Sequence, residues 1–267
     1  MKILFDNLLE SATFSSVNAS ANYPVSNLVD GFLRVRYQAA ATTDSIEITP
    51  TSAITMNSFY LGYIGNVSSI TLRVFSGDEL RTVALGAEHG TGETDTVRVD
   101  STGGAIMHFG AGATDFFEDY DGALQFVSAH FPAISGVDRI LIDLVGSDPF
   151  YVGGMAGGLA VEPPSPDAAW QDDQVNRSPV VRSPHGQVQQ LYIEPYKQFL
   201  FTFNGATFAE FSAIKAGAMA VGSHPVWVTF FEDSPTDYPP GYYTMSLGSP
   251  QRERRLYRFT LNFEEAR

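Results

Sequence analysis

Hydrophobic and polar residues alternate with a period of two in several short stretches of the first 162 residues. The clearest of these stretches are 45–49, 70–75 and 139–144. Such alternation is typical of strands that bury one face. Glycine-containing turn signals stand at 76–78, 102–104 and 135–136. Short strands separated by frequent turns predict an antiparallel jelly roll or β-sandwich for this part of the chain.

The last third of the chain combines alternating stretches with one helical pattern. Thr207 and Glu210 have the spacing of a capping box, in which each side chain bonds the other residue's backbone N–H. Apolar residues then recur at helical spacing up to Gly222, which predicts a helix over about 207–221. Alternating stretches at 198–203, 225–230 and 256–263 predict strands around it. The expected fold class is therefore mainly β, with a smaller C-terminal β-rich domain that holds one α-helix.

A proline-rich segment predicts the boundary between two domains. Residues 161–167 contain three prolines, and proline interrupts both helices and central strands. We therefore expect a jelly-roll domain at 1–162, a linker at 163–176 and a mixed β domain at 177–267. The charge divides unevenly at this point, with 19 acidic and 7 basic residues before 163 and 11 acidic and 9 basic residues after it.

Composition narrows the function classes. The chain of 267 residues has 16 basic and 30 acidic residues and a net charge of −14, which argues against nucleic acid as a partner. It has no cysteine, which excludes disulfides and thiolate metal sites. No apolar run reaches the ~20 residues of a membrane helix, so membrane insertion is not expected. The start of the chain lacks the apolar core of a signal peptide, which fits assembly in a cytoplasm.

The N-terminal segment resembles a discoidin-like, galactose-binding-like domain. Residues 12–16 are small and polar, and Tyr23-Pro24-Val25-Ser26-Asn27-Leu28-Val29-Asp30-Gly31 follows the P-x-x-N-x-x-D-G pattern of that family. Asn27, Asp30 and Gly31 are also turn formers in their own right. The chain departs from the family in having no cysteine and no tryptophan soon after Gly31. For this reason, lectin-type sugar contacts are not carried over residue by residue.

Two further segments resemble virion proteins of tailed bacteriophages. Residues 151–158 are similar to the closing strand of such domains there, and the order of motifs at 182–187 and 222–228 is similar to a companion domain. The resemblance implies a non-enzymatic structural component of the virion, at the tail tip or the fibre-attachment region. Its expected partners are other tail proteins, further copies of itself in a homo-oligomer, and host-surface polysaccharide during attachment.

The densest acidic cluster is the candidate metal site. Asp115, Glu118, Asp119 and Asp121 precede Gly122, and oxygen-rich loops that end in glycine can hold Ca²⁺. Their spacing does not fit an EF-hand loop, and a solvated loop is the simpler interpretation. The same acids could also serve a paired-carboxylate glycosidase. No other cofactor is expected. The five histidines are scattered without metal-ligand spacing, which is typical of isolated core or surface residues.

Two segments of the second domain are candidate contact surfaces. Tyr238, Tyr242 and Tyr243 surround a Pro-Pro-Gly turn, and exposed tyrosines favour protein or sugar contacts. The alternative for this segment is a rigid turn that packs on its own domain. Arg252, Arg254 and Arg255 make a locally basic segment that is expected to dock on neighbouring subunits.

Three functions remain open from the sequence. The first is a structural virion component that acts through subunit assembly. The second is a free-standing carbohydrate-binding module that uses the jelly-roll loops. The third is a polysaccharide-degrading enzyme, which two modest domains accommodate poorly because depolymerases need a long substrate groove.

Overall fold

The computed structural model divides the chain into two units. It describes residues 1–29, 36–77, 79–80, 98–99, 105–109, 125–167, 171–175, 180–182, 188–190, 196–230, 241–253 and 255–266. Unit 1 consists of Met1–Val161 and Trp227–Gly241, and unit 2 of Glu162–Val226 and Tyr242–Arg267. The chain therefore returns to unit 1 after the helix, which differs from the expected simple division near residue 163.

Unit 1 is an antiparallel β-sandwich built on one long strand. Its elements are β1 (Lys2–Leu4), β2 (Thr13–Ser16), the 3-10 helix η1 (Val25–Val29), β3 (Tyr37–Gln38), β4 (Thr43–Thr49), β5 (Ile54–Ser76), β6 (Glu79–Leu80), β7 (Arg98–Val99), β8 (Ala105–Phe109), β9 (Gln125–Val137), β10 (Arg139–Val152), β11 (Gly154–Gly158) and β16 (Val226–Thr229). The predicted strands at 45–49, 70–75 and 139–144 are confirmed within β4, β5 and β10.

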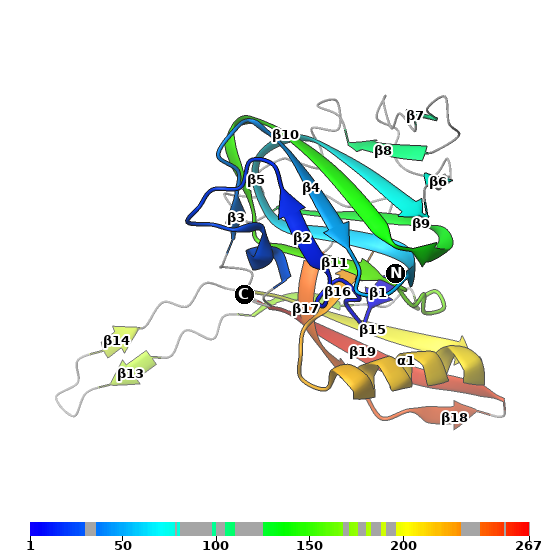
Figure 1. Cartoon of the computed structure of the whole chain (residues 1–267). Helices are drawn as coiled ribbons and strands as arrows, with labels where there is room; N and C mark the ends of the chain where they lie inside the picture. The colour runs from blue at the N-terminus through cyan, green and yellow to red at the C-terminus, as the bar shows by residue number, and fades with distance from the viewer. Residues whose placement is uncertain are drawn as a thin grey trace. The chain divides into compact units, whose positions relative to one another are not determined.

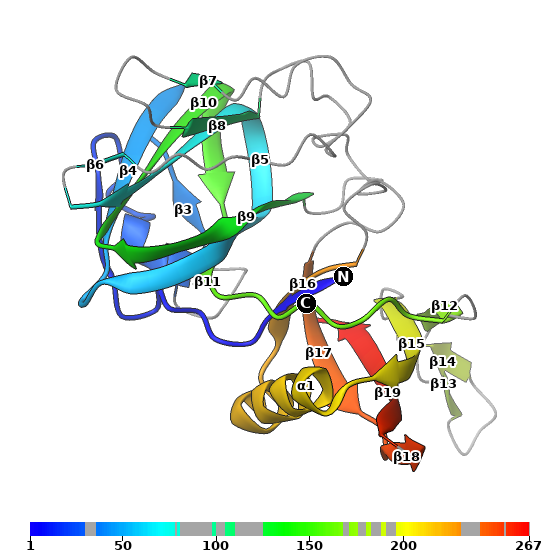
Figure 2. The same cartoon turned by 90° about the vertical axis from the view of Figure 1, so that its right-hand side faces the viewer.

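The long strand β5 belongs to both layers of the sandwich. Its first half, up to Ile64, pairs with β9 and β11. Its second half, from Gly65 onward, pairs with β10, and β10 in turn pairs with β4. The register shifts at the change of layer, where Asn66 has a φ of 63°. Strands that pass from one sheet to the other through such irregularities close the corners of sandwiches. Figures 1 and 2 show β5 curving past β9 and β10.

The core of unit 1 lies between these layers. It consists of inward-facing residues at alternate positions, among them Ile46 and Ile48 of β4, Leu72 and Val74 of β5, and Ile140, Ile142 and Leu144 of β10. Each of these side chains is at most 1% exposed. The period-two pattern in the sequence therefore marks the buried face correctly. Burial of such apolar side chains supplies the main driving force for folding.

Unit 2 is a small antiparallel sheet with one helix. Its elements are β12 (Gln171–Val175), β13 (Val180–Arg182), β14 (Val188–Gln190), β15 (Tyr196–Ala206), α1 (Phe208–Val221), β17 (Gly241–Leu247), β18 (Gln251–Glu253) and β19 (Leu256–Glu265). β19 lies between β15 and β17, and β12 pairs with the outer side of β15. The segment 163–176, expected to be a linker, thus contains the strand β12.

Aromatic rings fill the space between the helix and the sheet in unit 2. Phe199, Phe201 and Phe203 are fully buried on one face of β15, as their alternation predicts. Phe211 of α1 contacts both Tyr257 and Phe259 of β19, at ring-centroid distances of 4.8 and 5.5 Å. Figure 1 shows α1 lying along this sheet. No helix in the described part of the chain is both long and apolar enough to cross a membrane.

The predicted capping box of α1 is confirmed. The Glu210 backbone N–H donates to Thr207 Oγ1 at 3.3 Å, and the Thr207 backbone N–H donates to a Glu210 carboxylate oxygen at 2.7 Å. These contacts lower the pKa of the Glu210 carboxyl, because the backbone N–H of Thr207 favours the charged form. The helix therefore begins at the residue that the sequence indicates.

We expect Thr207→Ala to destabilise the first turn of α1 by about 1 kcal/mol, because one orphan backbone N–H loses its acceptor. Hydrogen exchange of the Glu210 and Phe211 amides, which both donate to Thr207, should become roughly fivefold faster than in the unchanged protein. Ser212→Ala, in the same helix but outside the capping box, serves as the control. Equal exchange rates in the two variants would contradict the role assigned to Thr207.

Candidate functional site

Four segments of unit 1 meet at one end of the sandwich, and we call this region the loop end. They are residues 17–24, residues 36–43, the bend of β5 at Gly65–Asn66, and residues 145–151 of β10. Backbone hydrogen bonds join three of them: the Ala40 N–H donates to the Asn18 carbonyl at 2.7 Å, and the Gly146 N–H donates to the Thr42 carbonyl at 2.7 Å. Asn66 Nδ2 donates to the Pro149 carbonyl at 3.4 Å, which connects β5 to the same region.

The buried carboxylate of Asp44 holds the first two segments together. Asp44 is 5% exposed, and its Oδ1 accepts the backbone N–H groups of Val17, Asn18 and Ser45 at 3.1, 2.9 and 2.8 Å. Its Oδ2 accepts the hydroxyls of Ser16 and Tyr37. A buried charge is tolerated only where hydrogen bonds replace its lost hydration, and five donors do so here. The turn after β2 is thereby fixed to the start of β4.

The pKa of the Tyr37 phenol is shifted by this environment. Burial and the hydrogen bond to the Asp44 carboxylate raise the pKa of the Tyr37 phenol above its ordinary value. Both causes act in the same direction, because each disfavours the phenolate. The fold therefore requires Tyr37 in its neutral form, in which its hydroxyl donates a hydrogen bond to the Asp44 carboxylate.

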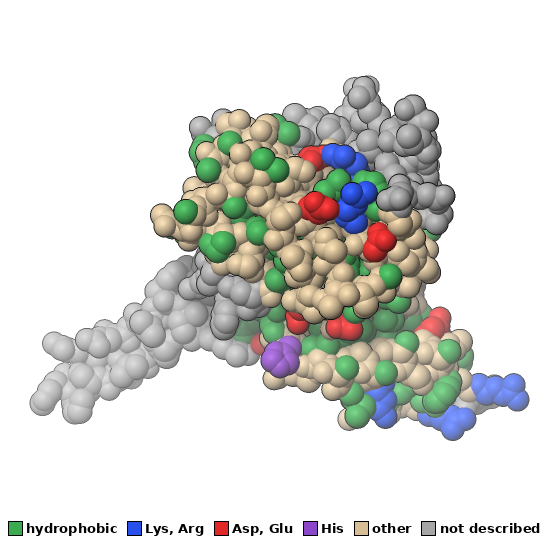
Figure 3. Space-filling view, in the orientation of Figure 1, with side chains coloured by type: hydrophobic (Ala, Val, Ile, Leu, Met, Phe, Trp, Pro, Cys, Tyr) green, Lys and Arg blue, Asp and Glu red, His purple; other side chains and the backbone are tan. Residues whose placement is uncertain are grey.

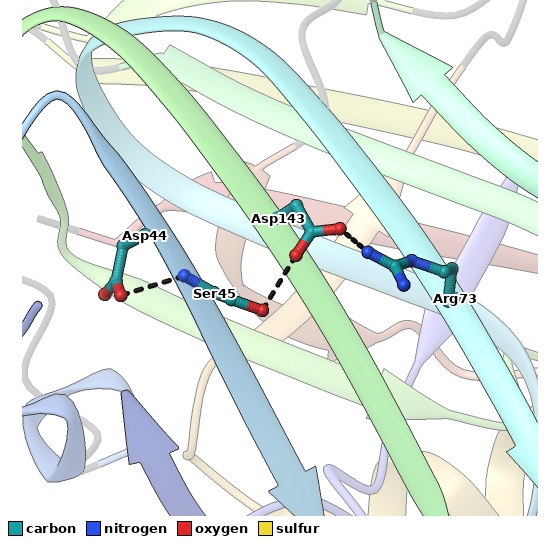
Figure 4. A network of polar contacts seen from close by, with 4 residues as sticks. All are labelled: Asp44, Ser45, Arg73 and Asp143. Carbon is teal, nitrogen blue, oxygen red and sulfur yellow. Dashed lines mark hydrogen bonds and ion pairs between the residues drawn. The ribbon is translucent and has the colours of Figure 1, made fainter. Parts of the chain in front are cut away.

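A polar network continues from Asp44 across the outer face of the sheet (Figure 4). Ser45 Oγ donates to Asp143 Oδ1 at 2.7 Å, and the other oxygen of Asp143 pairs with the Arg73 guanidinium. These residues come from β4, β10 and β5, and in Figure 3 acidic and basic side chains gather over these strands. Because Asp143 and Arg73 neutralise each other, this face is best explained as a structural feature of the sheet.

Two tyrosines and one arginine form the most distinctive surface feature of the loop end. The Arg36 guanidinium carbon lies 4.5 Å from the centroid of the Tyr151 ring and 5.7 Å from that of the Tyr23 ring. Tyr23 is 38% exposed, whereas Arg36 and Tyr151 are half-buried. Asn27 Nδ2 donates to the Arg36 carbonyl at 2.9 Å and fixes the backbone at this position. We call these three side chains the Tyr–Arg–Tyr stack.

Gly65 provides the space for one ring of the stack. A Cβ atom built at Gly65 would overlap Cζ, Cε1 and the hydroxyl oxygen of Tyr151. The ring therefore lies directly against the backbone of β5, at the residue opposite it in the ladder. Any larger residue at 65 would displace the ring, so the bend of β5 and the position of Tyr151 depend on the same glycine.

A buried serine–histidine pair also exists in unit 1, but its surroundings do not fit catalysis. Ser58 Oγ and Thr229 Oγ1 each lie 2.9 Å from a ring nitrogen of His130. Ser58 also donates to Asn57 Oδ1 at 3.0 Å, and Thr229 donates to Ser128 Oγ at 3.0 Å, so neither hydroxyl proton is directed at His130. Ser58, His130 and Thr229 are 0%, 5% and 2% exposed. The expectation of an isolated core histidine is confirmed for His130.

The predicted acidic cluster lies outside the described residues. This applies to Asp115, Glu118, Asp119 and Asp121, so the calcium site stays a prediction. Across the described part of the chain, no group of three or more His, Asp or Glu side chains is placed to hold a metal ion.

The three tyrosines of the predicted contact surface have different environments. Tyr238 lies outside the described residues, and Tyr242 is half-buried. Tyr243 is only 3% exposed, and its ring packs edge-on against Phe199 and Phe263 at 5.9 and 6.5 Å. The contact role expected for Tyr243 is therefore wrong, because its ring belongs to the core of unit 2. The alternative, a segment that packs on its own domain, fits this residue.

The predicted basic segment lies at the hairpin between β18 and β19. Arg252 and Arg255 are exposed there, while Arg254 lies outside the described residues. Arg36, Tyr23 and Tyr151 belong to no binding motif in the sequence. For Tyr23, the one feature of the sequence that could have indicated an exposed ring is its position before a proline in a polar loop.

Comparison with known proteins gives only distant structural neighbours. No family model matches the chain, and no curated protein does. Solved structures that resemble it include the module CpGH89CBM32-5 from Clostridium perfringens in complex with GalNAc-beta-1,3-galactose, at 10% identity and a TM-score of 0.37, covering 57% of this chain and 99% of that chain.

Two further structures are similar at the same level. The lectin domain of lectinolysin complexed with Lewis B antigen has 10% identity and a TM-score of 0.40, and covers 57% of this chain and 95% of its own. The family 32 module from C. perfringens NanJ in complex with galactose has 12% identity and a TM-score of 0.38, and covers 59% of this chain and 98% of its own. At such TM-scores the likeness assigns neither a family nor a ligand, so function must be argued from the residues.

The stability of unit 1 should fall at alkaline pH because of Tyr37. A phenol with a raised folded-state pKa contributes its full stability below the ordinary tyrosine value of about 10, and loses it as pH rises towards the folded value. At neutral pH, Tyr37→Phe should be less stable by roughly 1–2 kcal/mol through loss of the hydrogen bond to Asp44. This difference in unfolding free energy should shrink above pH 10. Only the unchanged protein has a tyrosine at position 37 that loses its proton on unfolding in this pH range.

Urea unfolding at several pH values measures this effect. A Trp170→Phe background leaves Trp227, which belongs to unit 1, as the fluorescent reporter. Unfolding free energies of the two proteins that stay parallel between pH 8 and 11.5 would contradict the coupling of Tyr37 to Asp44.

Proposed function

We propose that unit 1 is a non-catalytic carbohydrate-binding unit and that the Tyr–Arg–Tyr stack is its contact surface. The observation that carries the proposal is the position of the Arg36 guanidinium, 4.5 Å from Tyr151 and 5.7 Å from Tyr23, at the loop end of a β-sandwich. Of the functions that the sequence leaves open, we thus prefer the carbohydrate-binding module to the structural virion component.

The chemistry of the stack suits a sugar. A pyranose ring presents C–H groups on its faces and hydroxyls around its edge. A flat tyrosine ring can cover the C–H face at low entropic cost, because it has only two side-chain torsions. The guanidinium supplies several N–H donors in one plane for the hydroxyl oxygens. Apolar faces with a few fixed polar groups are the usual composition of small-ligand sites.

The stack is also held in place before any ligand arrives. Gly65 seats the Tyr151 ring, Asn27 fixes the Arg36 backbone, and Asp44 holds the neighbouring turn at 16–18. Groups that are already ordered lose less conformational freedom on binding. The same features favour binding over chemistry, because the Asp44 carboxylate at this end is buried and occupied by five donors.

The expected role in a phage virion rests on the sequence resemblance alone, since none of the three structures named above is described as a virion protein. A glycan-binding unit is compatible with that role, because attachment to host-surface polysaccharide needs such a surface.

Assembly through unit 2 is a second candidate function, and one observation favours it. The helix α1 exposes Phe208 at 66% and Met219 at 73%, and these residues lie three turns apart on one side of the helix. Arg252 and Arg255 are exposed on the β18–β19 hairpin of the same unit. Exposed apolar side chains near basic ones are typical of protein contact surfaces.

The glycan proposal predicts loss of binding when the stack is broken. Tyr151→Ala should weaken binding of a glycan selected on an array of host-type and bacterial polysaccharides by at least about tenfold, because stacking area and the cation–π contact are both lost. Gly65→Ala should weaken it in the same direction by displacing the Tyr151 ring. Titration calorimetry of the full chain, with and without Ca²⁺, measures both effects.

Phe75→Ala is the matched control, since Phe75 also contacts an arginine of unit 1, Arg139 at 4.2 Å, but away from the loop end. Thermal unfolding shows whether each variant remains folded. Unchanged glycan affinity in folded Tyr151→Ala and Gly65→Ala would refute the location of the site. No binding by the unchanged protein to any array member would refute the function.

The assembly candidate predicts a change in mass. If unit 2 docks on further subunits, light scattering behind a sizing column should show an oligomer for the unchanged chain. Arg252→Glu combined with Arg255→Glu should shift it to the monomer, because two exposed cations at the contact become anions. Lys2→Glu, in unit 1, serves as the control for reversal of a single charge outside the β18–β19 hairpin. A monomer before any substitution would argue against self-assembly.

A further inference from the structure

We infer that the ligand of the Tyr–Arg–Tyr stack carries a carboxylate, as in a uronic or sialic acid. The inference rests on the proposed carbohydrate-binding function and names the class of sugar. It depends on how the Arg36 guanidinium is placed and on which groups it contacts.

The Arg36 guanidinium carbon lies over both tyrosine rings, and no hydrogen bond among the described residues uses its N–H groups. A cation over an aromatic ring interacts through the flat face of that ring. The five N–H groups of arginine lie in the guanidinium plane and point outward from its edge, so stacking does not consume them. Because the Tyr23 and Tyr151 rings both lie within 6 Å of the guanidinium carbon, the position of the cation is restricted before binding.

No described carboxylate pairs with this guanidinium. The contacts of Arg36 among the described residues are the two rings and the hydrogen bond from Asn27 to its backbone carbonyl. This contrasts with Arg73 of β5, which forms an ion pair with Asp143. Arg36 is half-buried, so its charge is less hydrated than that of a fully exposed arginine. A positioned, partly desolvated cation of this kind favours an anionic partner.

A carboxylate satisfies this geometry better than a hydroxyl does. Its two oxygens accept two parallel N–H bonds from one edge of the guanidinium, and such charge-assisted bonds are roughly twice as strong as neutral ones. A sugar hydroxyl offers one oxygen and no charge. Tyr23 and Tyr151 would then cover the ring of the same sugar or its neighbour.

The net charge of the chain sets the conditions of the test. Residues 1–162 contain 19 acidic and 7 basic residues, so the chain as a whole repels an anionic sugar at long range. At 0.15 M salt the screening length is about 8 Å, which suppresses this repulsion but leaves a direct, partly buried ion pair largely intact. Affinities should therefore be compared at that salt concentration.

The experiment compares acidic sugars with their neutral methyl esters, which differ only in the charged group. Trigalacturonate, a hyaluronan tetrasaccharide and sialyllactose are titrated into the full chain, each beside its ester, together with neutral galacto- and gluco-oligosaccharides. At least one acid should bind about tenfold or more tightly than its ester. Arg36→Gln should remove that difference, and Arg36→Lys should retain only part of it, because lysine has no planar fork.

Arg139→Gln is the matched control, because Arg139 also lies over an aromatic ring of unit 1 but outside the loop end. It should keep the full preference for the acid. Equal affinity for acids and esters, or a preference that survives in folded Arg36→Gln, would overturn the carboxylate inference while the carbohydrate-binding function stands. Failure of every acidic and neutral sugar to bind would overturn the proposed function as well.

Discussion

The bend of β5 at Gly65–Asn66 is the constraint on which unit 1 depends. One strand pairs with β9 and β11 before the bend and with β10 after it, so both layers of the sandwich share a single covalent path. The positive φ of Asn66 and the absence of a side chain at Gly65 make the change of direction sterically accessible. The same glycine admits the Tyr151 ring. The passage of β5 between the two layers and the position of the proposed binding surface thus both depend on Gly65.

Polar groups inside unit 1 act as fixed connectors between segments that are distant in the chain. Asp44 joins the turn at 16–18 to β4 through three hydrogen bonds, and His130 joins β5 to Thr229 of the segment that returns after the helix. Each buried polar group costs free energy unless it is paired, so such networks tolerate few alternative arrangements. The loop end can therefore present side chains in defined positions although much of it is irregular backbone.

The regular parts of the fold could be predicted from the sequence. Alternation identified β4, the second half of β5 and β10, and the Thr207–Glu210 spacing gave the start of α1, because these signals depend on neighbouring residues. The first half of β5 contains a continuous apolar run, which has no period of two. Other features depend on residues that are distant in the sequence. The burial of Tyr243 depends on Phe199 and Phe263. The return of 227–241 to unit 1 depends on pairing between β1 and β16. Tyr23, Arg36, Gly65 and Tyr151 come from four segments, so no spacing in the sequence connects them.

The central claim is that a sugar binds at the Tyr–Arg–Tyr stack, and a crystal structure of the full chain grown with a bound oligosaccharide tests it most directly. The account predicts a pyranose ring against Tyr23 or Tyr151 with its oxygen atoms within hydrogen-bond distance of the Arg36 guanidinium. A sugar bound on the outer face of β4 and β10, or on unit 2, with none at the stack, would contradict it.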